Sequence, residues 1–271
     1  MWSGDRVSDR LFDEEYFATL LEAEERHFWF RARNRVLLGL FQQVAADLPA
    51  GYRVLEVGCG NGNVLKALAD HCPGSTVVGM DAYMQGLRYA RSRTSCHLVA
   101  GDARQPPFRA EFDVVGAFDV VEHVTDDVGL LCSLRDVLKP GGVLLISVPA
   151  HKSLWSYFDV ASCHVRRYEW GELRHKLESA GYRVEYLTYC MAAILPLVWF
   201  LRKVRGHQRQ SQDLSEDRAA AREYALREVR VVPLLNQVLE WMLSLERHVV
   251  GRRFALPLGT SLLAWARRPI R

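Results

Sequence analysis

Residues 54–65 read VLEVGCGNGNVL, and this stretch decides the fold. A short apolar run is followed by Gly58, Gly60 and Gly62 and then by apolar residues at helical spacing. This order predicts a strand, a tight turn and a helix. Because glycine tolerates positive φ and lets a ligand approach the backbone, we expect bare amides beside a helix N-terminus. The stretch therefore predicts a nucleotide-type binding cradle.

The glycine spacing distinguishes between kinds of cradle. A dinucleotide fingerprint reads GxGxxG, and its third glycine would stand at the position of Asn63. The sequence instead reads ExGxGxG from Glu56. This pattern resembles motif I of the class I S-adenosylmethionine (SAM) dependent methyltransferases. The resemblance implies SAM as cofactor and an α/β fold, Rossmann-like and doubly wound, with seven strands of which the last is antiparallel.

Composition sets the outer limits. The chain has 271 residues, 49% of them hydrophobic and 25% charged, which suits one large domain or a domain with an added lid. A net charge of +3 does not demand a nucleic-acid partner, and six widely spaced cysteines indicate a reducing compartment. Residues 1–17 lack the apolar core of a secretory signal, and the apolar run 187–201 is shorter than the ~18 residues of a spanning helix. We expect a cytoplasmic protein, with peripheral contact to the inner face of a membrane left open.

Apolar runs and turn residues mark the remaining elements. The expected strands are 53–57, 75–81, 96–100, 112–118, 143–148, 183–188 and 261–267. The expected helices are one or two over 13–46, then helices ending at 70, over 128–138, 169–180, 191–204, 211–232 and 233–250, with a turn at 139–142. The turn belongs to an LKPGG stretch that is typical of the family.

These elements predict three parts. Residues 1–48 form an N-terminal helical cap, residues 49–189 and 259–271 form the SAM-binding domain, and residues 190–258 form a helical insertion before the last strand. The family usually joins the last two strands by a short connection, so the insertion needs its own role. We expect a lid over the active site. The alternatives are a surface that rests on anionic lipid headgroups and an extension that packs on the domain or on a second copy.

The resemblance assigns SAM-binding residues to the first two strand ends. Glu56 is expected to order the turn and help hold the methionine amino group, and the turn itself to line the cofactor through Gly58, Cys59, Gly60 and Gly62. Cys59 is expected to be packed, with its backbone amide facing the ligand. Asp81, about 20 residues past the glycines, is placed to accept hydrogen bonds from the ribose hydroxyls, with Ala82 beside it. The alternative for Asp81 is a helix N-cap.

Three further contacts are implied by the same resemblance. Asp102 is expected to accept from the adenine amine, with the amide of Ala103 meeting the ring; the alternative is an ordinary turn aspartate. Asp119 is expected to contact the methionine portion. Arg33, within the aromatic and basic block 27–35, is expected to close over the methionine end. A solvated helix face is the alternative for each arginine of that block.

Two histidines are the candidate bases. His123 and His164 are expected to act in catalysis, because neutral imidazole is suited to accept a proton near pH 7. Asp119-x-x-Glu122-His123 also resembles the metal site of small-RNA 2′-O-methyltransferases and of some quinone O-methyltransferases, and His164 precedes Tyr168-Glu169-Trp170 as in the former. We predict that no metal is bound and keep these four residues as the alternative ligand set.

The predicted function is methyl transfer from SAM to a hydrophobic or lipid-linked small molecule, with oxygen as the methylated atom. An RNA methyltransferase and a SAM-binding protein without activity are the alternatives. The sequence shows no zinc knuckle or basic tail, so no nucleic-acid partner is expected. Monomer and homodimer both remain open.

Overall fold

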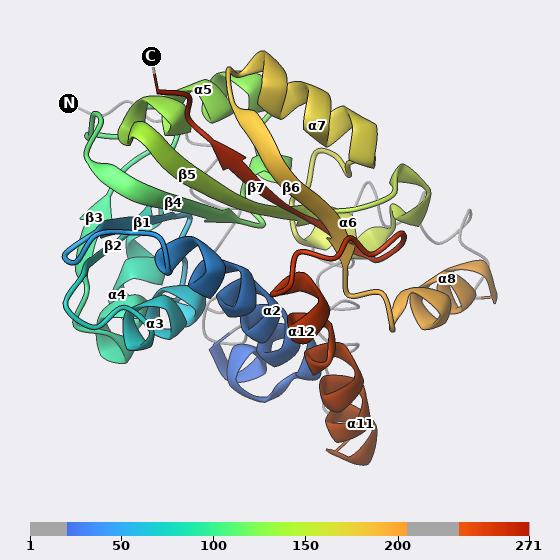
Figure 1. Cartoon of the computed structure of the whole chain (residues 1–271). Helices are drawn as coiled ribbons and strands as arrows, with labels where there is room; N and C mark the ends of the chain where they lie inside the picture. The colour runs from blue at the N-terminus through green and yellow to red at the C-terminus, as the bar shows by residue number, and fades with distance from the viewer. Residues whose placement is uncertain (1–20, 205–232, 271) are drawn as a thin grey trace.

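A computed structural model describes residues 21–204 and 233–270, and these build one seven-stranded sheet. The strand order is β3-β2-β1-β4-β5-β7-β6, and β7 runs antiparallel to both neighbours while the other pairs are parallel. The strands are β1 (Arg53–Val57), β2 (Thr76–Asp81), β3 (His97–Ala100), β4 (Phe112–Phe118), β5 (Leu138–Pro149), β6 (Arg183–Cys190) and β7 (Ser261–Arg267). The predicted fold class is confirmed (Figure 1).

Helices cover both faces of the sheet (Figure 1). One face carries α2 (Phe28–Ala45), α3 (Asn63–Asp70) and α4 (Met84–Arg93), and the other carries α5 (Asp127–Val137) and α7 (Trp170–Ser179). The alternation of β1 explains the two cores, since Val54 packs in the first and Leu55 and Val57 in the second. The loops after β4 and β5 carry the short 3-10 segments η2 (Val121–His123) and η3 (Lys152–Leu154) and the helix α6 (Tyr157–Ala161).

The predicted turn at 139–142 is part of β5, which begins at Leu138 rather than at residue 143. Gly141 does adopt a turn-like φ of 81°, but its amide donates to the Arg268 carbonyl at 2.9 Å. Lys139 reaches across to the Asp113 carboxylate of β4 at 2.8 Å. These contacts hold the turn residues in the sheet and shorten the preceding helix to Val137.

The insertion between β6 and β7 is helical where it is described, with α8 (Leu195–Val204), α11 (Pro233–Ser244) and α12 (Glu246–Val250). The single helix expected over 233–250 is wrong, because α11 and α12 are separated at Leu245. The helix expected from residue 191 begins only at Leu195. The Glu246 carboxylate accepts the amides of Met191, Ala192 and Ala193 at 2.6, 2.8 and 3.2 Å, and this holds them outside the helix. The helix expected over 211–232 lies outside the described residues.

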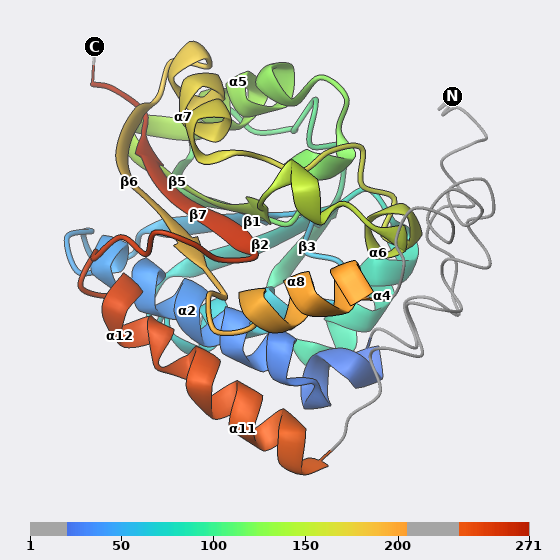
Figure 2. The same ribbon diagram turned by 90° about the vertical axis from the view of Figure 1, so that its right-hand side faces the viewer.

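Helix α11 is fastened to α2 by polar contacts at its inner face. The Asn236 side chain accepts from the amide of Phe28 at 2.7 Å and donates to the carbonyl of Arg26 at 3.0 Å. Glu240 forms ion pairs with Arg31 at 3.3 Å and with Arg35 at 2.6 Å. Figure 2 shows α11 running beside α2 along the outer edge of the molecule. The insertion and the N-terminal helix are thus joined.

Within residues 21–204 and 233–270, no helix combines the length and the apolar character needed to cross a bilayer.

Of the helices expected over 13–46, residues 21–26 are helical and α2 follows after His27, whose side chain accepts from the Trp29 amide at 3.3 Å.

Candidate active site

Strained backbone gathers where the strands end. Three of the six described non-glycine residues with positive φ are Asp119, His151 and Met191, with φ between 56° and 59°. Asp119 directly follows β4, His151 comes two residues after β5, and Met191 directly follows β6. Such conformations cost free energy and cluster at functional sites. The carboxyl edge of the sheet is therefore the candidate location of the site.

The glycine turn after β1 leaves open space at one position. Gly58, Gly60 and Gly62 all have positive φ, at 69°, 47° and 76°. A Cβ at Gly58 would lie 2.5 Å from a methyl of Val120, and one at Gly62 would lie 2.9 Å from the Cβ of Ala90. A Cβ at Gly60 would meet no atom of the described residues within 4 Å. Gly58 and Gly62 therefore allow Val120 and Ala90 to pack against the turn, whereas Gly60 faces open space.

The backbone amides of the turn are bonded within the protein. Those of Gly58 and Cys59 donate to the Met80 carbonyl at 2.8 and 3.1 Å, and that of Gly60 donates to the Asp81 carboxylate at 2.8 Å. The expectation of bare amides, with that of Cys59 facing a ligand, is wrong for this conformation, because amides this close to the core need partners of their own. The Cys59 side chain is packed, as predicted, with 5% of its surface exposed.

Two buried carboxylates stand beside the turn. Glu56 is 2% exposed, one of its oxygens lacks a hydrogen-bond partner among the described residues, and burial raises its pKa well above the ordinary value. Asp81 accepts from the amides of Gly60 and Tyr83, both at 2.8 Å, and burial also raises its pKa. The N-cap of α4 is Tyr83, so the N-cap alternative for Asp81 is wrong.

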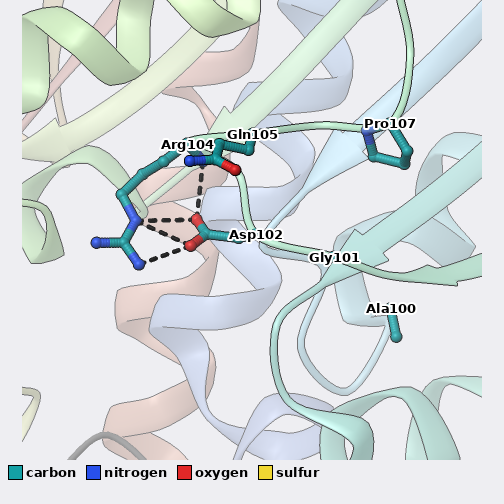
Figure 3. Close-up of a pocket in the computed structure, with 6 residues that line it drawn as sticks. All are labelled: Ala100, Gly101, Asp102, Arg104, Gln105 and Pro107. Carbon is teal, nitrogen blue, oxygen red and sulfur yellow. Dashed lines mark hydrogen bonds and ion pairs between the residues drawn. The ribbon is translucent and has the colours of Figure 1, made fainter. Parts of the chain in front are cut away.

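A pocket of about 500 Å³ lies at the end of β3 (Figure 3). Its lining residues are Ala100, Gly101, Asp102, Arg104, Gln105 and Pro107. Arg104 folds back onto the Asp102 carboxylate, with Nε 2.9 Å and Nη2 2.6 Å from one oxygen, and its hydrogen bonds lower the pKa of Asp102. The Gly101 amide donates to the Asp81 carbonyl at 3.0 Å, which joins the pocket to the end of β2. Adenine binding by Asp102 and Ala103 stays a prediction. In that case the Asp102 carboxylate would bind both Arg104 and the adenine amine.

An ion pair joins α2 to the end of β4. Arg33 Nη1 lies 2.5 Å from Asp119 Oδ2, and the Ser147 hydroxyl donates to the other Asp119 oxygen at 3.0 Å. The guanidinium also lies over the Trp29 ring, 4.9 Å from its centroid. The two residues singled out in the sequence are thus direct partners, whereas the neighbouring arginines of the block bind Glu240.

The two candidate bases meet beside a buried acid. The rings of His123 and His164 are 5.0 Å apart, edge to face, and His164 Nε2 lies 3.8 Å from a Glu122 oxygen. Ligand atoms of these three residues lie within 4.8 Å of one another and could hold a metal ion. Asp119 does not join this group and is bound to Arg33 instead. The structure therefore gathers three of the four alternative metal ligands.

Asp159 completes this group, and no role was predicted for it. It is fully buried and accepts from His164 Nδ1 at 2.9 Å, from Arg167 Nε at 2.7 Å and from the Ser156 amide at 2.8 Å. Burial alone would raise the pKa of Asp159, but the hydrogen bond from His164 and the charge of Arg167 outweigh it and lower that pKa. The signal in the sequence was the S-x-x-D pattern of a capping box, Ser156 to Asp159, which the structure forms.

Burial also shifts the pKa values of Glu122 and His123, which precede this loop. Both Glu122 oxygens lack hydrogen-bond partners among the described residues, and burial, helped by the nearby Asp119 charge, raises the Glu122 pKa well above its ordinary value. Burial, with the neighbouring His164, lowers the pKa of His123 to about 4. Glu122 thus favours its neutral carboxyl form and His123 its neutral imidazole form in the folded chain.

The lowered pKa of His123 predicts that the free energy of unfolding falls as the pH is lowered below 6.5. Between pH 6.5 and 4 the unfolded chain binds a proton at His123 that the folded chain does not, so stability is lost as the pH falls. We expect this residue to account for a loss of about 3 kcal/mol in unfolding free energy across the window. Urea unfolding of wild type and His123→Asn at both pH values measures it, with exposed His175→Asn as control. Parallel pH curves for wild type and His123→Asn would contradict it.

A family model described as "Methyltransferase domain" matches residues 26–187, more than half of the chain. The chain belongs to this family and carries a class I SAM-dependent methyltransferase domain.

The relatives of this methyltransferase agree with that assignment. A Mycolicibacterium smegmatis protein named "Probable S-adenosylmethionine-dependent methyltransferase" is 33% identical over 165 residues, covering 59% of this chain and 62% of that protein. A ubiquinone biosynthesis O-methyltransferase of Dinoroseobacter shibae is 38% identical over 103 residues, covering 36% of this chain and 41% of that protein. The chain thus spans less than two thirds of the length of these relatives.

Among solved structures, Haemonchus contortus phosphoethanolamine N-methyltransferase 2 in complex with SAM shares the fold, with a TM-score of 0.62 at 16% identity. The match covers 98% of this chain and 59% of that one.

The site of this methyltransferase fits SAM on two observations. No atom of the described residues fills the space in front of Gly60. A buried Glu56 oxygen near the turn has no hydrogen-bond partner among the described residues, so it is available to accept from a positively charged group of a ligand. SAM carries an amino group and a sulfonium but no phosphate, so a turn whose amides are already bonded is no obstacle. Asp81, held at the same turn, has further lone pairs for hydroxyl donors.

Proposed function

We propose that this methyltransferase methylates a hydroxyl group of a hydrophobic small molecule and that His164 is its general base. The observation that carries the proposal is the Asp159–His164 pair, in which a buried carboxylate fixes one ring nitrogen at 2.9 Å. The pair lies beside Glu122 and His123, which follow the end of β4 at the carboxyl edge of the sheet. Ligands of doubly wound sheets bind at that edge.

The pair favours one tautomer of His164. Because its pKa is lowered, Asp159 is ionised near neutral pH and accepts the proton of His164 Nδ1. His164 Nε2 is then left with its lone pair, ready to accept a proton from an acceptor hydroxyl. When bound, SAM supplies the electrophilic methyl group. Holding the acceptor oxygen in line with that group is the larger part of the task.

The surroundings of His164 favour an apolar acceptor. Trp155, Phe158 and Val165 come from the same loop region and are 40%, 37% and 48% exposed. Exposed apolar side chains close together commonly mark a binding surface. The relatives named for ubiquinone biosynthesis are O-methyltransferases, which supports both the oxygen and the hydrophobic character of the acceptor.

The cofactor contacts are proposed as the sequence predicted them. Glu56 holds the methionine amino group, Asp81 the ribose and Asp102 the adenine. Arg33 on the N-terminal cap closes over the methionine end, where its bond to Asp119 already places it. Since α11 is joined to α2, the cap and the insertion lid would move together.

The proposal requires no metal. Asp119 is neutralised by Arg33 and a protonated Glu122 is a weak ligand, so the group keeps two imidazoles and little negative charge. A reducing, cytoplasmic location is proposed as well, because no disulfide joins any two of the six cysteines.

Labelled SAM and hydrophobic cell extracts test the acceptor. The purified full chain is incubated with each extract, and methylated products are identified by mass spectrometry, with the extract alone as control. We expect a methyl ether of an apolar alcohol or phenol. A matched pair of model acceptors, an alkylphenol and the corresponding alkylaniline, separates oxygen from nitrogen. Transfer to the aniline alone would refute O-methylation, and transfer to water-soluble acceptors alone would refute a hydrophobic substrate.

A further inference from the structure

Helix α11 carries an apolar stripe on its outer face. The α11 stripe consists of Leu234, Leu235, Val238, Trp241, Met242 and Leu245, which are between 38% and 75% exposed. Their spacing repeats at three and four residues, so they share one side of the helix. The buried residues Asn236, Leu239, Glu240 and Leu243 occupy the opposite side. The outward side of the helix is therefore apolar, whereas its inward side carries the polar residues Asn236 and Glu240.

No described residue covers the α11 stripe. In both Figure 1 and Figure 2 the helix lies at the edge of the molecule, with α2 on its inner side. The contacts that hold it, at Asn236 and Glu240, all belong to that inner side. Two further exposed apolar residues follow α12, Phe254 at 64% and Leu258 at 54%, on a loop that lies along β6. An apolar surface of this extent points to a partner.

The exposed charges of the segment that carries the stripe have one sign. Residues 233–258 contain two acids, Glu240 and Glu246, and both are buried and occupied, the first by arginines of α2 and the second by backbone amides. The basic side chains of Arg247, Arg252 and Arg253 are exposed. The outward side of this segment thus offers apolar and positively charged groups without a competing exposed acid.

We propose that the α11 stripe, with the exposed Arg252 beyond its C-terminal end, is a docking surface for an anionic lipid bilayer. A helix of 12 residues is too short to cross the hydrocarbon layer and suits a position along the interface. Tryptophan is favoured at that depth, and Trp241 stands within the stripe at 66% exposed. Arg252 would bind lipid phosphates. Residues 233–258 hold no exposed acid that would repel those phosphates.

Vesicle flotation with the full chain tests the surface without SAM, so its outcome is independent of methyl transfer. We expect the protein to float with phosphatidylglycerol vesicles, to float poorly with phosphatidylcholine vesicles, and to dissociate as salt is added. Trp241→Glu, and separately Arg252→Glu, should weaken binding by about tenfold or more. The matched controls are Trp170→Glu and Arg174→Glu, which lie on α7 and should bind as wild type does.

Three results would overturn the proposal. One is the absence of flotation with anionic vesicles. Another is equal weakening by the control variants, which would indicate a nonspecific effect of charge. The third is a wild-type dimer in light scattering that Trp241→Glu converts to a monomer while neither binds vesicles, which would assign the stripe to a second copy of the chain.

Discussion

Gly60→Val is expected to abolish measurable SAM binding while the protein stays folded. The valine side chain would project into the space in front of the turn, where residues 21–204 and 233–270 place no atom within 4 Å of a Cβ. The clash is therefore with the ligand. Calorimetric titration with SAM measures the effect, and we expect affinity at least ~100-fold weaker, equal to about 3 kcal/mol.

Gly74→Val is the matched control for this variant. Gly74 also has positive φ, at 76°, and also meets no atom within 4 Å, so it carries comparable backbone strain away from the site. Both variants should lose similar thermal stability, and only Gly60→Val should lose SAM. Asp81→Ala should weaken SAM binding as well, since it removes the proposed ribose acceptor and releases the Gly60 amide. Wild-type affinity in both Gly60→Val and Asp81→Ala would overturn the cofactor assignment.

His164→Ala is expected to lower the rate of methyl transfer by about 10²- to 10⁴-fold with little change in SAM affinity. The reason is that the variant removes the proposed base but none of the proposed cofactor contacts. Asp159→Asn should lower the rate less and shift its pH profile, because it alters the group that fixes the His164 tautomer. Initial rates across pH with the identified acceptor, together with calorimetry for SAM, provide the measurement.

Exposed His175 on α7 serves as the control for this series, and His175→Ala should keep the wild-type rate. Added imidazole should restore part of the activity of His164→Ala, which a purely structural role would not allow. The same assay with a chelator tests the predicted absence of a metal. A rate lost on chelation and restored by Mg²⁺ would instead assign Glu122, His123 and His164 to an ion. An unchanged rate in His164→Ala would remove the base from the mechanism.

Local patterns predicted the sheet well because their signals are short in range. The glycine turn, the apolar runs and the acidic residue that ends β2 each lie within a few residues of the feature they specify. The exception is the LKPGG stretch, where contacts from Asp113 and Arg268 extend β5 through residues that read as a turn. Long-range pairing there overrides the local preference.

The structure brings several of the predicted site residues into contact, and these contacts could not be predicted from local patterns. Arg33 and Asp119 were predicted as site residues for separate reasons. Their ion pair joins residues 86 positions apart, and no local sequence pattern connects residues at that distance. Asp159 and His164 are five residues apart, yet their contact depends on α6 turning the chain between them. The bonded amides of the turn could not be foreseen either, since their acceptors, the Met80 carbonyl and the Asp81 carboxylate, belong to the neighbouring strand β2.

The carboxylate of Glu246, at the start of α12, accepts the three amides that follow β6. The chain between Ala193 and Glu246 is thus a closed loop, and the entropy of closing a loop rises only slowly with its length. Residues can therefore be gained or lost between α8 and α11 with little strain on the sheet. In evolutionary terms, the length of the insertion can change while the contacts of Glu246 keep β6 and α12 together.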